Sequence, residues 1–113
     1  MAYFRIGCKG SGGTPHSGSF SGADLFTINL GFVPSVILMT NLTSGAQYMI
    51  AYIKEYSSGT YRVLVPNTPG YTVNLGSSLH AMGTLSLTSN GFSFDTRNMG
   101  YGTGGKWYWC AAE

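Results

Sequence analysis

The chain has 113 residues, the length of a single compact domain, and a chain of this length buries roughly two thirds of the surface that it exposes when unfolded. Only 9% of the residues are charged, whereas an average soluble domain has about 25%. The net charge is +2 and the basic residues are scattered, which excludes the basic stripe of a nucleic-acid-binding protein. A surface with so little charge is expected to lie partly against other subunits, so we expect a homo-oligomer.

Residues Met1–Arg5 lack the basic and then apolar pattern of a secretion signal, and no apolar stretch approaches the ~20 residues that a membrane span needs. We therefore expect a soluble protein that is made in a cytoplasm and does not insert into a membrane. Cys8 and Cys110 lie near opposite ends of the sequence. In a reducing compartment two buried thiols are favoured over a disulfide, although the sequence leaves a bond between them open.

Turn-forming residues recur every 8–12 residues along the chain, and the short segments between them are rich in β-branched and aromatic residues, a spacing that is typical of sandwiches and barrels. No segment has a convincing helical pattern. We predict one all-β domain over residues 1–113, an antiparallel, jelly-roll-like β-sandwich of about eight short strands. The candidate strands are Tyr3–Cys8, Leu25–Leu30, Val36–Met39, Ala46–Tyr56, Tyr61–Val65, Tyr71–Leu75, Leu79–Leu87, Phe92–Phe94 and Lys106–Ala112.

The segment Gly10–Gly22 is rich in glycine and serine, which predicts a flexible loop or an assembly arm. After it, Leu25–Leu30 alternates between two faces of a strand. Because successive side chains of a strand point to opposite sides, Phe26, Ile28 and Leu30 are expected to face the core.

The tyrosines of Ala46–Tyr56 fit the period of a strand and also the helical spacing of four residues. A strand is favoured, because Ser57–Gly59 provides a short turn into Tyr61–Val65 and the two segments then form a hairpin. A second hairpin is predicted at Ser89–Gly91, since Asn-Gly accepts the positive φ angles of a type I′ turn.

The last predicted strand has aromatic or small apolar residues on both faces. Trp107 and Trp109 share one face, and Tyr108 and Cys110 share the other. Such a strand is expected in the centre of a sheet or at a subunit interface, so we expect Trp107 and Trp109 in the core or in an oligomer interface.

The sequence predicts no metal site and no cofactor. His16 and His80 have no second ligand at metal-binding spacing, and the glycines of Gly100–Gly105 lead into an aromatic strand and not into the helix of a dinucleotide site. Phosphate-loop and serine-nucleophile motifs are also absent.

Four carboxylates are available for acid–base chemistry: Asp24, Glu55, Asp95 and Glu113. A glycosidase would need two of them to converge across a cleft. Because solvated carboxylates at strand ends are the commoner case, we expect a protein without catalytic residues, with a small glycan-cleaving enzyme as the alternative.

Aromatic residues make up 14% of the chain. An aromatic ring can stack on the apolar face of a sugar, and it can equally fill a protein core or interface. Loops on a rigid sheet are the usual carriers of binding residues, so Tyr56, Tyr61 and Tyr101 are the candidate ligand contacts.

Three segments resemble, in order, a C-terminal β-sandwich module of bacteriophage tail-fibre and virion structural proteins. They are Leu30–Val36, with its Gly-Phe-Val-Pro turn, Ser89–Phe92, with its Asn-Gly-Phe hairpin, and the aromatic ending Gly105–Glu113. The resemblance spans Leu30–Glu113.

The resemblance implies a phage or prophage virion protein, made in the bacterial host cytoplasm, that acts as an adhesion or assembly module in a tail fibre, baseplate or head decoration. It also implies a homotrimer, contacts with other virion proteins, and binding to host surface glycans. The alternative from the residues alone is a free-standing carbohydrate-binding, lectin-like domain.

Overall fold

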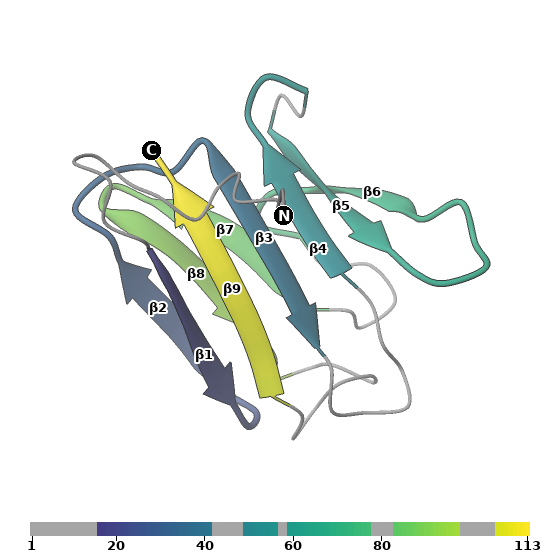
Figure 1. The fold of residues 1–113 in the computed structure, drawn as a ribbon, viewed down its shortest axis with the longest axis horizontal. Helices are drawn as coiled ribbons and strands as arrows, with labels where there is room; N and C mark the ends of the chain where they lie inside the picture. Colours follow the sequence, from purple (N-terminus) through teal and green to yellow (C-terminus); the bar gives the residue numbers. More distant parts are fainter. Residues whose placement is uncertain (1–15, 42–48, 57–58, 78–82, 98–105) are drawn as a thin grey trace, which may run out of the picture.

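The computed structural model describes residues 16–41, 49–56, 59–77, 83–97 and 106–113. These residues contain strands and turns and no helix, which confirms the all-β prediction. Figure 1 shows the strands of the described residues. They are β1 (Ser17–Ser21), β2 (Leu25–Asn29), β3 (Val36–Asn41), β4 (Met49–Ile53), β5 (Thr60–Leu64), β6 (Tyr71–Asn74), β7 (Thr84–Thr88), β8 (Gly91–Asp95) and β9 (Lys106–Ala112).

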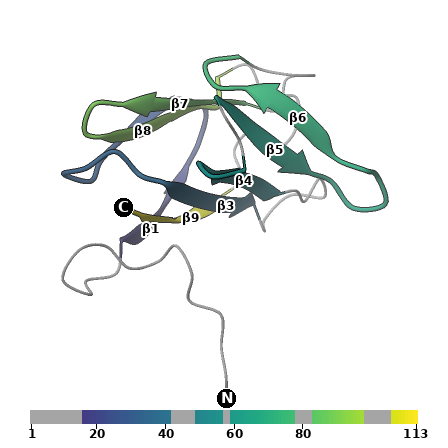
Figure 2. The ribbon, with the colours of Figure 1, turned by 90° about the horizontal axis from the view of Figure 1, so that it is seen from above.

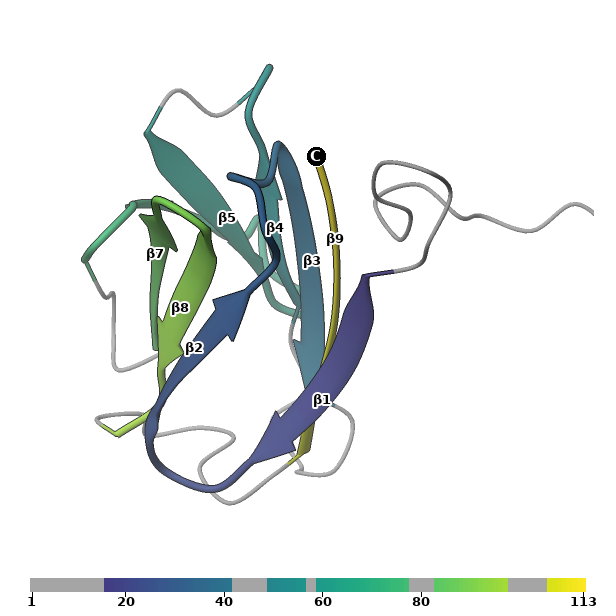
Figure 3. The same ribbon diagram turned by 90° about the vertical axis from the view of Figure 1, so that its left-hand side faces the viewer.

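The strands form two antiparallel sheets that face each other, as Figure 3 shows, and the predicted β-sandwich is confirmed. The larger sheet has the order β1-β9-β3-β4-β5-β6, and the smaller sheet has the order β2-β8-β7. The four consecutive strands β3 to β6 lie side by side as a meander, which the jelly-roll expectation did not include. Figure 2 shows that the β5–β6 hairpin extends beyond the rest of the larger sheet.

The core lies between the sheets and is built from the inward residues of each strand. Its largest member, Trp107 on β9, is fully buried, and its ring contacts Phe94 of the smaller sheet edge-on at a centroid distance of 5.1 Å. The predicted inward face of the segment that contains β2 is confirmed, because Phe26, Ile28 and Leu30 pack against the core. The buried hydrophobic residues are Phe20, Ile37, Met39, Ile50, Tyr52, Tyr61, Val63, Val73, Leu85, Phe92, Phe94, Trp107 and Ala111.

The prediction of a loop or arm over Gly10–Gly22 is wrong for its second half. Residues 10–15 lie outside the described residues, but Ser17–Ser21 forms the edge strand β1 and pairs with β9 in antiparallel register. The strand forms because Phe20 turns inward into the core while the neighbouring serines point outward. Because the segment is rich in serine and glycine, the sequence did not show that Phe20 makes it a strand with one buried side chain.

Both predicted hairpins are present. Strand β4 ends at Ile53 and pairs with β5, so the strand interpretation of this segment is confirmed over Met49–Ile53. In the other hairpin Thr88 pairs with Gly91, which leaves Ser89 and Asn90 as the turn. Neither has a positive φ, so the predicted type I′ turn is wrong.

Gly91 has a different role from the one that the sequence predicts. It belongs to strand β8, where a Cβ atom would collide with the carbonyl oxygen of Ile28 on β2. The glycine is therefore required by the close approach of the neighbouring strand and not by the turn.

We predict that Trp107→Ala lowers the free energy of unfolding by about 3–5 kcal/mol, because it removes the largest fully buried side chain and leaves a cavity. Urea denaturation followed by circular dichroism measures the change. Tyr56→Ala is the matched control, since this ring is 83% exposed and its loss is expected to change stability by under about 0.5 kcal/mol. Equal losses for the two variants would contradict the assignment of Trp107 to the core.

Candidate functional site

The outward faces of the two sheets differ in chemistry. The smaller sheet carries mainly short polar residues outward, as is usual for an antiparallel sheet with one face in water. These residues are Thr27, Asn29, Thr84, Ser86, Thr88, Ser93 and Asp95, with Leu25 at one corner. The larger sheet is apolar on both faces over its central strands, and this outward surface is the candidate functional site.

The outward residues of β9, β3 and β4 form a continuous surface that we call the apolar stripe. Strand pairing places Cys110, Leu38 and Ala51 in one row across the three strands, and Tyr108, Thr40 and Met49 in the next row. The complete stripe consists of Val36, Leu38, Thr40, Met49, Ala51, Ile53, Tyr108, Cys110 and Ala112. None of these nine residues is charged, but Lys106 also faces outward at the start of β9, with its ammonium 5.5 Å from the centroid of the Tyr108 ring, and gives one end of the stripe a positive charge.

Polar residues border the apolar stripe on both sides. Strand β1 presents Ser17, Ser19 and Ser21, and strands β5 and β6 present Arg62, Thr72 and Asn74. The Arg62 guanidinium donates hydrogen bonds to the Thr72 hydroxyl at 3.2 Å and to the Pro69 carbonyl at 3.0 Å. An apolar centre with a polar rim is the usual composition of a protein–protein interface.

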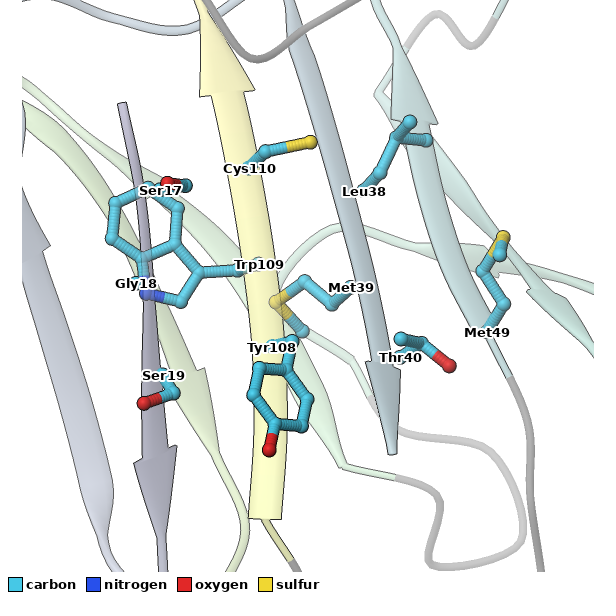
Figure 4. A pocket seen from close by; sticks show the side chains of 10 residues that line it. All are labelled: Ser17, Gly18, Ser19, Leu38, Met39, Thr40, Met49, Tyr108, Trp109 and Cys110. Atoms are coloured by element: carbon cyan, nitrogen blue, oxygen red, sulfur yellow. The ribbon is translucent and has the colours of Figure 1, made fainter. Parts of the chain in front are cut away.

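A depression of about 510 Å³ lies in the apolar stripe beside β1 (Figure 4). Met49 and Tyr108 stand on its border and are 40% and 42% exposed, whereas its wall along β1 is formed by small residues. The volume is within the range of small-ligand pockets and also suits a large side chain from another protein. It is lined by Ser17, Gly18, Ser19, Leu38, Met39, Thr40, Met49, Tyr108, Trp109 and Cys110.

Gly18 and Trp109 pair directly across β1 and β9 and both line the depression. A Cβ atom on Gly18 would lie 2.9 Å from the Trp109 indole nitrogen, so the indole occupies the space that a side chain would take (Figure 4). The indole also contacts the Phe92 ring of the smaller sheet edge-on, at a centroid distance of 5.4 Å. Trp107 and Trp109 therefore both lie on the inward side of the sheet. The sequence predicts them in the core or in an oligomer interface, and both pack in the core.

Tyr61 is a core residue, so its assignment as a ligand contact is wrong. It is fully buried, and its hydroxyl donates to the Ser77 carbonyl at 2.8 Å and lies 3.2 Å from the Gly83 carbonyl. Burial raises the pKa of the phenol. The strand alternation that turns Val63 inward also turns Tyr61 inward.

The other two candidate tyrosines are not brought together with Tyr61. Tyr56 lies in the turn after β4, is 83% exposed and is available to an external ligand. Tyr101 lies outside the described residues. Sequence reasoning missed Leu38, Met49 and Ala51 as site residues, although both alternating sets of side chains in β3 and β4 are mainly apolar, and that pattern was a usable signal.

Two of the four candidate carboxylates, Asp24 and Asp95, lie at neighbouring strand ends of the smaller sheet, where Leu25 pairs with Asp95. The Arg97 side chain donates hydrogen bonds to both oxygens of Asp95, at 3.0 and 2.9 Å, and these bonds lower the pKa of Asp95. Asp24 accepts the Leu25 backbone N–H at 2.7 Å. Neither Asp24 nor Asp95 lines the depression, and both make local structural contacts.

We predict that Leu38→Glu converts an oligomer to a monomer while the protomer stays folded. Leu38 is half-buried in the middle of the apolar stripe, so a carboxylate there would be buried without a partner in any complex that covers this face. Light scattering coupled to size exclusion gives the mass, and circular dichroism checks the fold. Thr27→Glu, on the polar face of the smaller sheet, is the control and should leave the mass unchanged. An unchanged mass for Leu38→Glu would show that the stripe is not an interface.

Within the described parts of the chain, no group of three or more His, Cys, Asp or Glu residues is placed to hold a metal ion. The same residues include no helix that is long and apolar enough to cross a membrane. Comparison with protein-family models, with curated proteins and with solved structures finds no match. The site is therefore interpreted from its own residues.

Proposed function

We propose that this chain is a structural protein of a phage or prophage virion, an adhesion and assembly module of a tail fibre, baseplate or head decoration that works as a homotrimer without enzymatic activity. The observation that carries the assembly role is the apolar stripe on the outward face of the larger sheet. The virion assignment rests on the resemblance of Leu30–Val36, Ser89–Phe92 and Gly105–Glu113 to the phage module.

The apolar stripe supports assembly because covering it is energetically favourable. Removing apolar surface from water contributes roughly 25 cal/mol per Å², and Met49, Leu64 and Tyr108 are each at least 40% exposed on this face. Lys106 is the one charged side chain among the outward residues of β9, β3 and β4, so a partner would bury few groups that need ion pairing. A virion subunit meets this requirement, since most of its surface neighbours are other subunits.

Adhesion is assigned to loop aromatics. Tyr56 presents most of its ring to solvent from a turn at the end of β4, beside Glu55 and Lys54. Such a ring can stack on a pyranose and offer its hydroxyl as a hydrogen-bond partner. The same observation favours the second candidate function, a free-standing lectin-like domain, which would bind glycans as a monomer.

The wild-type protein is expected to run as a particle of three times 12.0 kDa at micromolar concentration. The mass should persist in 1 M salt (on the order of ten times physiological ionic strength), because apolar contacts are not weakened by screening. Light scattering coupled to size exclusion measures both values. A monomer under these conditions would contradict the assembly role and leave the lectin-like alternative.

Replacing Tyr56 with Ala is expected to weaken glycan binding by about 1 kcal/mol or more, roughly fivefold, since it removes a stacking ring. Tyr56→Phe keeps the ring and should retain most of the affinity. A glycan array identifies the sugar, and calorimetry on both variants gives the change in Kd. An array without hits would exclude the adhesion role and leave a module that only joins virion subunits.

A further inference from the structure

We propose that Asn90 is the residue at which this chain deamidates, and that the isoaspartate formed there releases one end of the smaller sheet. Neither step depends on the proposed function. Asn90 is exposed in the turn between β7 and β8 and is followed by glycine. Its main-chain carbonyl holds the segment that follows β2 through hydrogen bonds.

The reaction needs only water. The main-chain nitrogen of Gly91 attacks the side-chain amide carbon of Asn90, a C–N bond forms, the nitrogen gives up its proton, and ammonia leaves. The product is a succinimide ring. Water then opens this ring at one of its two carbonyl groups. Opening at the former side-chain carbonyl gives aspartate, and opening at the main-chain carbonyl gives isoaspartate. Each conversion therefore consumes one water molecule and releases one ammonia.

The residue after each asparagine decides which asparagine reacts. Gly91 has no Cβ atom, so no side chain hinders the approach of its nitrogen once the main chain is free to rotate. Asn90 is the only asparagine in the sequence that is followed by glycine. Asn67 is the closest comparison, since it is also exposed in a turn but is followed by the β-branched Thr68. The sequence therefore favours reaction at Asn90.

The folded chain holds the reacting peptide group in place. The Gly91 nitrogen and the Asn90 carbonyl belong to one planar peptide group, and this carbonyl accepts the Leu30 N–H at 2.7 Å and the Gly31 N–H at 3.2 Å. When the nitrogen turns toward the side chain, the carbonyl turns with it and both bonds are lost. Gly91 also lies too close to the Ile28 carbonyl for a Cβ atom, in a strand that is paired on both sides (Figure 3). We therefore expect the reaction to require local opening of this end of the sheet.

Isoaspartate alters the main chain at this same point. It adds one carbon atom to the main chain before Gly91 and converts the former Asn90 carbonyl into a free carboxylate. Strand β8 lies between β2 and β7 and has no spare room at Gly91, so the added atom displaces the start of β8 relative to β2. The Leu30 and Gly31 N–H groups then lose their acceptor. Aspartate leaves the length of the main chain unchanged, so isoaspartate is the product that releases the sheet end.

Peptide mass spectrometry of the aged wild-type protein tests the site. The full-length chain is incubated in mildly alkaline buffer, with and without guanidinium chloride, and each deamidation raises the mass of a peptide by about 1 Da. In the unfolded chain, Asn90 is expected to convert at least about tenfold faster than Asn67, because glycine follows only Asn90. Similar rates at the two residues would overturn the assignment.

The same samples test the restraint by the fold. Asn90 is expected to convert at least about tenfold more slowly in the native protein than in guanidinium chloride, because its peptide group must first leave its hydrogen bonds. A synthetic peptide of residues 86–94, measured in both buffers, corrects for the effect of the denaturant on the chemistry itself. Equal corrected rates in the two states would show that the fold does not restrain Asn90, and the inference would fail.

Hydrogen exchange tests the structural consequence. The aged native protein is separated into its forms, and electron-transfer fragmentation distinguishes isoaspartate from aspartate at position 90. In the isoaspartate form, the amides of Leu30 and Gly31 are expected to exchange at least about tenfold faster than in the fresh protein, since their acceptor is gone. Unchanged exchange at these two amides would overturn the release of the sheet end.

Two variants separate the change in the main chain from other effects of ageing. Asn90→Asp carries the new charge on a main chain of normal length and is expected to keep the slow exchange of Leu30 and Gly31. Asn90→Gln has a longer side chain that cyclises slowly, and it is expected to keep the slow exchange after ageing. Faster exchange in Asn90→Asp would assign the effect to charge, and faster exchange in aged Asn90→Gln would assign it to another residue. Either result overturns the inference.

Discussion

Strand β9 has to satisfy two environments at once, and the rest of the structure depends on how it does so. Its inward residues Trp107 and Ala111 are fully buried against the smaller sheet, while Tyr108 and Cys110 face outward. Flanked by β1 and β3, it is hydrogen-bonded on both edges. An interior strand that is apolar on both faces needs a covering layer on each side. The smaller sheet provides one layer, and in the proposed assembly another subunit would provide the second over the apolar stripe.

The two sheets both contribute to the core but differ in the surface that each one exposes. The smaller sheet places Phe92, Phe94 and Leu85 in the core and presents hydroxyl groups to water on its other face. Its outward surface is mainly polar and can stay in contact with water. The larger sheet contributes the other half of the core. Its central strands also expose an apolar surface on the outward face.

The turn between β1 and β2 is held by a buried polar contact with Thr96, the residue after β8. Thr96 is fully buried, its backbone N–H donates to the Asp24 carbonyl at 2.9 Å, and its hydroxyl accepts the Asp24 N–H at 2.9 Å. The hydroxyl also lies 2.9 Å from the Gly22 carbonyl. These bonds hold the turn that carries the chain from β1 in the larger sheet to β2 in the smaller sheet, and so link the two sheets.

The sequence by itself determined the class of the fold, the inward face of β2, the two hairpins and the limits of the last strand, because alternation and turn chemistry are local properties. It did not determine that serine-rich β1 is a strand, that Gly91 is required by a neighbouring strand, or that Tyr61 is buried. Those depend on which strands become neighbours, and pairing partners are far apart along the chain. Only the tertiary structure decided that the apolar residues of β9, β3 and β4 join into one surface, since a shared face exists only once the order and register of the strands are set.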